Sequence, residues 1–118
     1  MALPSRVLAS GNAPLATVSI CGDGADALTA TGTTATDALQ LSAVFNTVAT
    51  AAASTGVKLP PTEAGALMVV ANDGANTLTV YPATGSTIDG GASVSIATTK
   101  RRVFIGVTAT KWVSVLGA

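Results

Sequence analysis

Apolar and polar residues alternate along much of the chain, in short runs that are separated by glycine, proline and aspartate. Two of these runs, residues 66–72 and 76–81, flank Asp73-Gly74, a dipeptide typical of two-residue hairpin turns. In the register of such a turn, one face of the hairpin is wholly apolar and carries Leu67, Val69, Leu78 and Val80. The opposite face is mixed and carries Met68, Val70, Thr77 and Thr79. The pattern therefore predicts a sheet that buries one side and offers the other to water or to another subunit.

The same period of two predicts further strands on both sides of this hairpin, over residues 15–21, 25–31, 92–98, 101–107 and 112–116. Residues 108–111 form the turn between the last two strands. A three-residue turn would pair Val107 with Val113, whereas a four-residue turn would pair Val107 with Trp112. The sequence leaves this register open.

Residues 37–54 fit two structures. A helix would be capped by Asp37 and would gather its apolar residues on one side: Ala38, Leu41, Phe45, Val48 and Ala52. Two features favour strands instead. Apolar residues stand at every second position on either side of Gln40 and of Asn46, and the segment contains threonines. Because the neighbouring segments are predicted strands, we favour two strands offset by a bulge or turn near Ser42-Ala43.

Together these runs predict an all-β fold, a jelly-roll-like β-sandwich or small barrel of about 8–10 short antiparallel strands. We assign residues 15–118 to this single β-domain. Residues 55–65 form a loop in which Pro60-Pro61 ends any regular element. Residues 1–14 hold two prolines and a glycine without a clear period, so they are predicted to form an extended N-terminal arm.

The surface of this domain is predicted to be poor in charge. Charged residues make up 10% of the chain, against ~25% in typical soluble domains, and the formal net charge is zero. Alanine, glycine, threonine and serine account for 62 of the 118 residues. Little electrostatic repulsion opposes association of such a chain, so we expect part of its surface to be covered in a homo-oligomer or larger assembly. The alternative is that the chain comes from a background in which proteins are generally poor in charge, and this would give the same composition.

Four of the six basic residues lie among the last nineteen positions. The run Lys100, Arg101 and Arg102 suits an acidic partner surface, although we favour a solvated strand entry that guards an edge strand. With Arg6 and Trp112, these residues are the candidate contacts with a partner or another subunit, although a tryptophan such as Trp112 is more often a core or cap side chain than a ligand platform. Zero net charge and four scattered aromatic residues argue against nucleic-acid binding.

The residue types also limit the chemistry of the chain. It has no histidine, which excludes Ser-His-Asp and Cys-His catalysis, and Cys21 is its single cysteine. Asp23 and Asp26 are the one close carboxylate pair, and Asp73 is a third conceivable calcium ligand. Their glycine-rich surroundings favour turn formation instead. We therefore predict no catalytic site, metal or cofactor, and no run of apolar residues reaches the ~18 that a membrane span needs.

Several motifs resemble a known family. They are TGVKLPP at residues 55–61, LMVVANDGANTLTVYPATGSTIDG at residues 67–90, a K-x-x-x-F strand that starts at Lys100, and a terminal K-W-V strand. Over residues 37–116 the chain resembles capsid decoration (cement) proteins of small tailed bacteriophages and related virion β-domains.

The resemblance implies a non-enzymatic virion protein that binds the major capsid protein on the outer surface of the phage head, often as a trimer, and stabilises the shell. Such a protein would be synthesised in the cytoplasm of the host bacterium. The alternative that the resemblance leaves open is a fibre, spike or tail-associated module. In that case Tyr81 or Trp112 would bind host carbohydrate.

Overall fold

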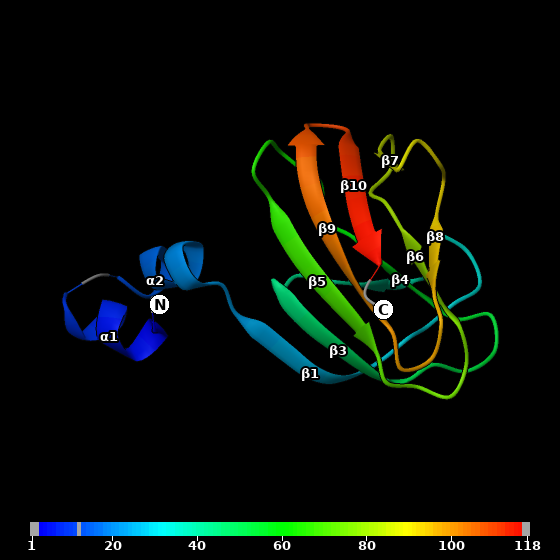
Figure 1. Ribbon diagram of the computed structural model, residues 1–118, viewed down its shortest axis with the longest axis horizontal. Coiled ribbons are helices and arrows are strands. Elements are labelled where there is room, and N and C mark those ends of the chain that lie inside the picture. The colour runs from blue at the N-terminus through cyan, green and yellow to red at the C-terminus, as the bar shows by residue number, and fades with distance from the viewer. Residues whose placement is uncertain (1–2, 12, 117–118) are drawn as a thin grey trace.

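The computed structural model describes residues 3–11 and 13–116, in which two N-terminal helices precede ten strands in two sheets (Figure 1). The helices are α1 (Pro4–Ala9) and α2 (Pro14–Cys21). Along the six-stranded sheet the order is β1 (Gly24–Thr29), β3 (Phe45–Thr50), β5 (Leu67–Asn72), β9 (Arg101–Thr108), β10 (Lys111–Leu116) and β7 (Thr87–Ile88). The four-stranded sheet has the order β2 (Leu39–Gln40), β4 (Gly56–Lys58), β6 (Leu78–Tyr81) and β8 (Val94–Ile96). The prediction of a mostly β structure with about 8–10 short strands is confirmed, whereas the predicted loop at residues 55–65 contains β4 and is corrected to that extent.

The first six strands follow a coil in which the chain passes from one sheet to the other and back. β1, β3 and β5 lie parallel in the six-stranded sheet, and β2, β4 and β6 lie parallel in the four-stranded sheet. Gly24, Phe45 and Val69 stand side by side, so successive turns of the coil take 21 and 24 residues here. This arrangement is that of a short β-solenoid with three turns, each of which adds one strand to each sheet.

The topology corrects the prediction of an antiparallel jelly roll or barrel, because five of the eight strand pairings are parallel. The predicted hairpin at Asp73-Gly74 is also wrong: β5 and β6 belong to different sheets, and this dipeptide carries the chain between them. Gly74 is required for close packing, since an added Cβ would lie 2.7 Å from the backbone nitrogen of Ala51 on the preceding turn. Within β5 the buried residues are Met68, Val70, Ala71 and Asn72, whereas Leu67 is exposed.

The last strands close the coil with antiparallel pairs. β8 pairs with β6, β9 pairs with β5, and β10 pairs with β9, while β7 runs parallel to β10 at the sheet edge. Thr108 opposes Lys111, and Trp112 then opposes Gly106, which leaves Val107 in a bulge. The pairing along the two strands therefore follows neither the three-residue turn, which would pair Val107 with Val113, nor the four-residue turn, which would pair Val107 with Trp112.

The core lies between the two sheets, and its largest members are Trp112 and Phe104, which are 1% and 0% exposed. Asn72 is also fully buried, and every polar atom of its side chain is bonded. Its Nδ2 donates to the carbonyls of Asn76 and Ile96 at 2.9 and 2.8 Å, and its Oδ1 accepts from the Gly74 N–H at 3.0 Å. This side chain thus joins the end of β5 to the segment before β6 and to the end of β8.

Residues 37–54 contain two strands, as favoured above: β2 ends at Gln40 and β3 begins at Phe45. Asp37 organises the loop before β2 instead of capping a helix. Its carboxylate accepts hydrogen bonds from the Thr34 N–H at 2.9 Å, the Thr34 hydroxyl at 2.8 Å and the Thr33 N–H at 3.2 Å. These bonds, the Thr34 backbone bond foremost, hold the pKa of Asp37 below its ordinary value of 3.8.

The N-terminal part is helical, which corrects both the predicted extended arm and the predicted strand at residues 15–21. Met1, Ala2 and Asn12 of the predicted arm lie outside the described residues. Each helix begins at a proline, whose fixed φ suits the first helical position. Both helices stand to the side of the two sheets, beyond the start of β1 (Figure 1).

Candidate functional site: the outer face of the six-stranded sheet

Apolar side chains cover the surface of the six-stranded sheet that points away from the core. Strand register places them in rows: Phe45, Val69, Val103 and Val115 form one row, and Leu67, Ile105 and Val113 form the next. With Val107 of the bulge, these eight residues make up what we call the outer face. Alternation along each strand puts their neighbours, such as Met68 and Phe104, in the core.

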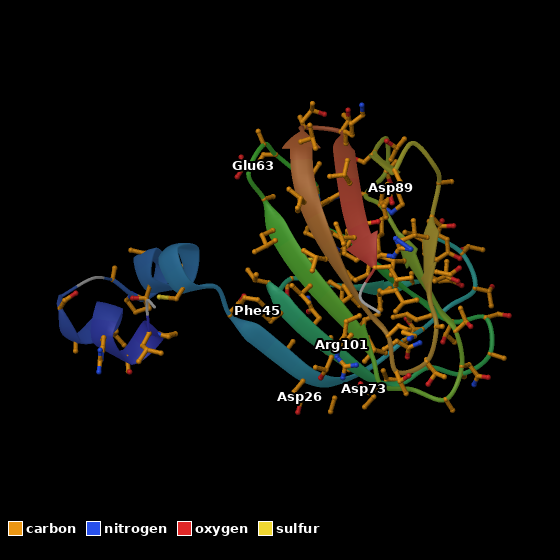
Figure 2. All side chains as sticks on the ribbon, in the orientation of Figure 1. Asp26, Phe45, Glu63, Asp73, Asp89 and Arg101 are labelled. Atoms are coloured by element: carbon orange, nitrogen blue, oxygen red, sulfur yellow. The ribbon has the colours of Figure 1, made fainter. Side chains whose placement is uncertain are left out.

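Much of the outer face is open to solvent. Phe45, Leu67, Ile105, Val107, Val113 and Val115 are between 36% and 62% exposed. Their exposed apolar area is on the order of 500 Å², near the upper limit of roughly 300–600 Å² for the largest patch on a typical monomer. Charged residues lie at its borders, with Glu63 at one end and Asp26, Asp73 and Arg101 at the other (Figure 2). The largest apolar patch of a protein is often functional.

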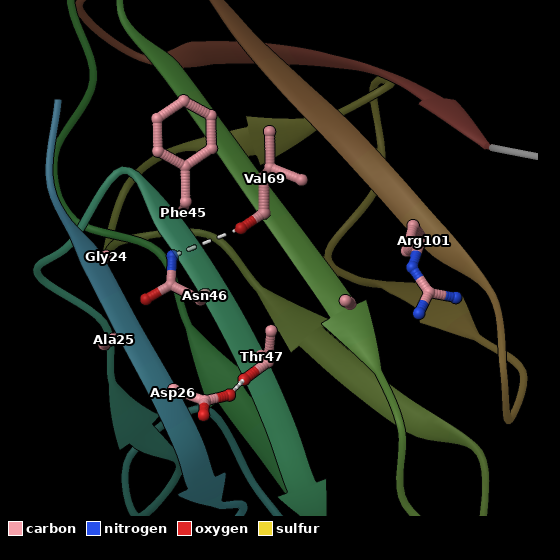
Figure 3. Close-up of a pocket in the computed structure, with 9 residues that line it drawn as sticks. Gly24, Ala25, Asp26, Phe45, Asn46, Thr47, Val69 and Arg101 are labelled. Carbon is pink, nitrogen blue, oxygen red and sulfur yellow. Dashed lines mark hydrogen bonds between the residues drawn. The ribbon is translucent and has the colours of Figure 1, made fainter. Parts of the chain in front are cut away.

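A hollow of about 550 Å³ opens on this surface where β1, β3 and β5 lie side by side (Figure 3). Phe45 and Val69 lie at one end of it, and Ala25 and Ala71 contribute further apolar surface. Asp26 and Thr47 lie together at the other end, where the Thr47 hydroxyl donates to the Asp26 carboxylate. The hollow is therefore apolar with one carboxylate at its rim.

Two further polar groups belong to this hollow. Arg101 of β9 forms an ion pair with Asp73, with 3.0 Å between Nη2 and Oδ1. Asn46 is 2% exposed, and its Nδ2 donates to the Ala43 carbonyl at 2.8 Å and to the Val69 carbonyl at 3.3 Å. Its Oδ1 has no hydrogen-bond partner within the described part of the chain. Since that atom is shielded from solvent, it is a cost to stability and not an accessible ligand group.

The candidate contact residues from the sequence do not form one patch. Arg101 points toward the outer face and Arg102 toward the core side, where it donates to the Ser114 hydroxyl at 2.7 Å and lies 3.9 Å from the Asp89 carboxylate. Lys100 is half-buried, and Arg6 is exposed on α1. The predicted basic cluster is thus divided between two sides of the sheet because successive residues of a strand face opposite ways.

Trp112 requires a correction, because it lies in the core and in this structure presents no surface to a partner or a sugar. Tyr81 is half-buried, and its hydroxyl donates to the Thr33 carbonyl at 3.2 Å.

The carboxylates that were predicted to favour turns bond to residues that are far away in the sequence, in or next to other strands. Asp23 Oδ1 accepts from the Val44 N–H at 2.9 Å, Asp26 is bonded to Thr47, and Asp73 is paired with Arg101. Among the described residues, no group of three or more histidine, cysteine, aspartate or glutamate side chains is placed to hold a metal ion. Each of these three aspartates thus has a structural partner in the fold.

Comparison of the chain with protein-family models, with curated proteins and with solved structures found no match. None of the described helices is long and apolar enough to span a membrane. The function therefore has to be argued from the geometry and chemistry of the outer face.

Sequence reasoning missed the outer face, although a signal for it is present. Val103, Ile105 and Val107 alternate with Phe104 and Gly106, so β9 is apolar on both sides. A strand that is apolar on both sides is typical of a sheet covered on both faces.

Proposed function

We propose that this chain is a non-enzymatic structural protein of a tailed-bacteriophage virion, a capsid decoration protein that binds the outer surface of the phage head and stabilises the shell. The observation that carries the proposal is the outer face, which is apolar, continuous over four strands and bordered by few charges. Its partner is the major capsid protein, and the chain acts as a homo-oligomer, with a trimer favoured. It is made in the bacterial cytoplasm and then joins the virion.

The physical basis of this function is repeated surface contact. A shell offers many identical sites, so modest contacts add up to strong attachment when several linked copies bind together. Small side chains on the rest of the surface lose little conformational entropy when a neighbour covers them. The β9 and β10 part of the outer face, with Ile105, Val113 and Val115, is the contact surface for the capsid in this proposal.

The test is binding of the purified chain to phage heads that lack it. Val115 is 62% exposed, so Val115→Lys leaves the fold intact and places an unpaired charge in the contact. We expect this variant to bind at least about tenfold more weakly than the wild type, consistent with the cost of a desolvated charge at an interface. The matched control is Ser95→Lys, at an exposed position of the four-stranded sheet, which should bind as the wild type does.

Equal binding of both variants, or no binding of the wild type to heads, would refute the proposal. Electron microscopy of the parent particle distinguishes a decoration protein from the second candidate, a fibre, spike or tail-associated module. Density on the shell supports a decoration protein, whereas density on the tail or fibres supports a tail-associated module.

A further inference from the structure

The two N-terminal helices, together called the helical segment, have the composition of a buried element. Neither helix contains an acidic residue, and Arg6 is the one charged side chain of the two. The apolar positions of α2 do not gather on one side of the helix. Helices of this kind are ordinarily buried in proteins, yet on this segment Leu8 is 48% exposed and Leu15 is 84% exposed.

The segment is held away from the outer face of its own chain. Two residues, Gly22 and Asp23, separate α2 from β1. Asp23 is fixed to the start of β3, because its carboxylate accepts from the Val44 N–H and its carbonyl accepts from the Phe45 N–H, each at 2.9 Å. Gly22 has a φ of +80° and packs against Phe45 and Val44. Because this connection is short and hydrogen-bonded, the helices stand to the side of the sheets, beyond the start of β1 (Figure 1).

The hollow between β1, β3 and β5 is complementary to this segment. Phe45, Val69 and the alanines of the hollow offer an apolar surface. Arg101 is already paired with Asp73, whereas Asp26 forms no ion pair within the described residues and is bonded to the Thr47 hydroxyl. The net charge left at the rim is therefore negative, and the one charge of the helical segment is positive.

The exposed area of the outer face is smaller than the area that a stable interface buries, so a further part of the chain has to take part in the contact. A stable interface buries about 800 Å² on each partner, more than the ~500 Å² that the exposed side chains of the outer face offer. The helical segment adds exposed apolar side chains, Leu8 and Leu15, to such a contact. Because one chain carries both the helices and the hollow, two copies of this chain are sufficient to form the contact.

We propose that the helical segment of one copy docks in the hollow of a second copy. The contact is heterologous, since different surfaces of the two copies meet, and it closes into a ring when the rotation between copies permits. A ring of three would agree with the trimer proposed above, although the docking itself does not depend on capsid binding. Arg6 of the first copy approaches Asp26 of the second, and Leu8 enters the apolar end near Val69.

Disulfide cross-linking between two full-length variants tests this contact. Both carry Cys21→Ser, so that the introduced thiols are the one source of cross-links; one variant carries Leu8→Cys and the other Val69→Cys. After mixing and mild oxidation we expect a cross-linked dimer of the two variants, at least about tenfold above the matched control. The control replaces Val69→Cys by Ala109→Cys, an exposed position in the β9–β10 turn.

Three outcomes would overturn the inference. Cross-linking of Val69→Cys with itself would mean that two outer faces meet directly. An internal cross-link in a chain that carries both Leu8→Cys and Val69→Cys would mean that the helices fold onto their own sheet. A yield equal to the control would mean that the contact does not form. The test uses the purified chain alone, so its failure leaves the result of the capsid-binding experiment unaffected.

Charge reversal provides an independent test by sedimentation. We expect Arg6→Glu and Asp26→Lys each to raise the dissociation constant of the oligomer about tenfold, and the double variant to return to within about twofold of the wild type. Circular dichroism verifies that the variants are folded. Additive weakening in the double variant would contradict the proposed pairing.

Discussion

The two faces of the six-stranded sheet have similar side chains and different surroundings. On the inner face Met68, Val70 and Phe104 are at most 4% exposed, whereas Leu67 and Ile105 on the outer face are 46% and 40% exposed. Burial of apolar area is favourable on either face, but within one chain it is realised on the inner face alone. The comparison shows that the fold buries the apolar side chains of one face of this sheet and leaves those of the other exposed, and we propose that a neighbouring molecule covers the exposed face.

The largest expected difference between the faces comes from removing one aromatic ring from each. Phe104→Ala should lower the free energy of unfolding by about 3–5 kcal/mol, because it leaves a cavity in the core. Phe45→Ala, at a residue that is 47% exposed, should cost about 1 kcal/mol or less in the isolated chain. Urea denaturation at low protein concentration measures both values. Equal losses would contradict the distinction between an inner and an outer face.

A smaller loss is expected at the polar centre of the inner side. Asn72→Leu leaves the Asn76 and Ile96 carbonyls and the Gly74 N–H without their partner, and should cost about 3 kcal/mol. The control is Asn76→Ala at an exposed residue, which loses the bond from Nδ2 to the Ala51 carbonyl and should cost about 1 kcal/mol. Thermal unfolding followed by circular dichroism compares the two. If the Asn72 variant were the more stable, its role in joining the strands would be wrong.

Polar substitution on the outer face should act on association rather than on folding. Val69→Thr, at a half-buried residue of the hollow, is expected to change the free energy of unfolding by about 1 kcal/mol or less and to lower the tendency of the chain to associate. Ile96→Thr is the control on the inner side, where the residue is 0% exposed, and it should destabilise the fold clearly. Light scattering and urea denaturation separate the two effects. An outer-face variant that associates as strongly as the wild type would argue against an assembly surface.

The smallest effect concerns Asp37, which lies away from both faces. Its folded pKa is lower than 3.8, so its ionised form stabilises the fold at pH values above 3.8. This contribution is lost as the pH falls through the lowered pKa. Asp37→Asn should therefore reduce the thermal midpoint slightly and equally at pH 7 and pH 5, and the difference from the wild type should shrink below pH 3.8. A difference that grows on acidification would have the wrong sign.

The sequence was sufficient to predict the strand content because alternation is a local property. The segments at 94–96, 101–108 and 111–116 and the break between β2 and β3 all follow from spacing and turn residues. Pairing is not local: the same alternation in β5 and β6 suits a hairpin or two separate sheets. The close approach of Gly74 to Ala51, a residue on another turn of the coil, is what the sequence could not show.

The helices and the site were harder to predict for related reasons. LATVSIC alternates as a strand would, and Pro14 is the one local sign of a helix start. For Trp112 the sequence left a contact role and a core role open, and the structure places it in the core, opposite Gly106. The outer face depends on the register between β3, β5, β9 and β10, which brings together residues up to 70 positions apart.

The central claim is that neighbouring molecules cover the outer face. For the hollow, where the neighbour is a second copy of this chain, sedimentation over a range of concentrations tests it most directly. The account predicts that the wild type sediments at a multiple of 11.5 kDa and that Val69→Lys, in the hollow, shifts it toward the single chain. A wild type that stays at 11.5 kDa at every concentration, with no change in the variant, would contradict it.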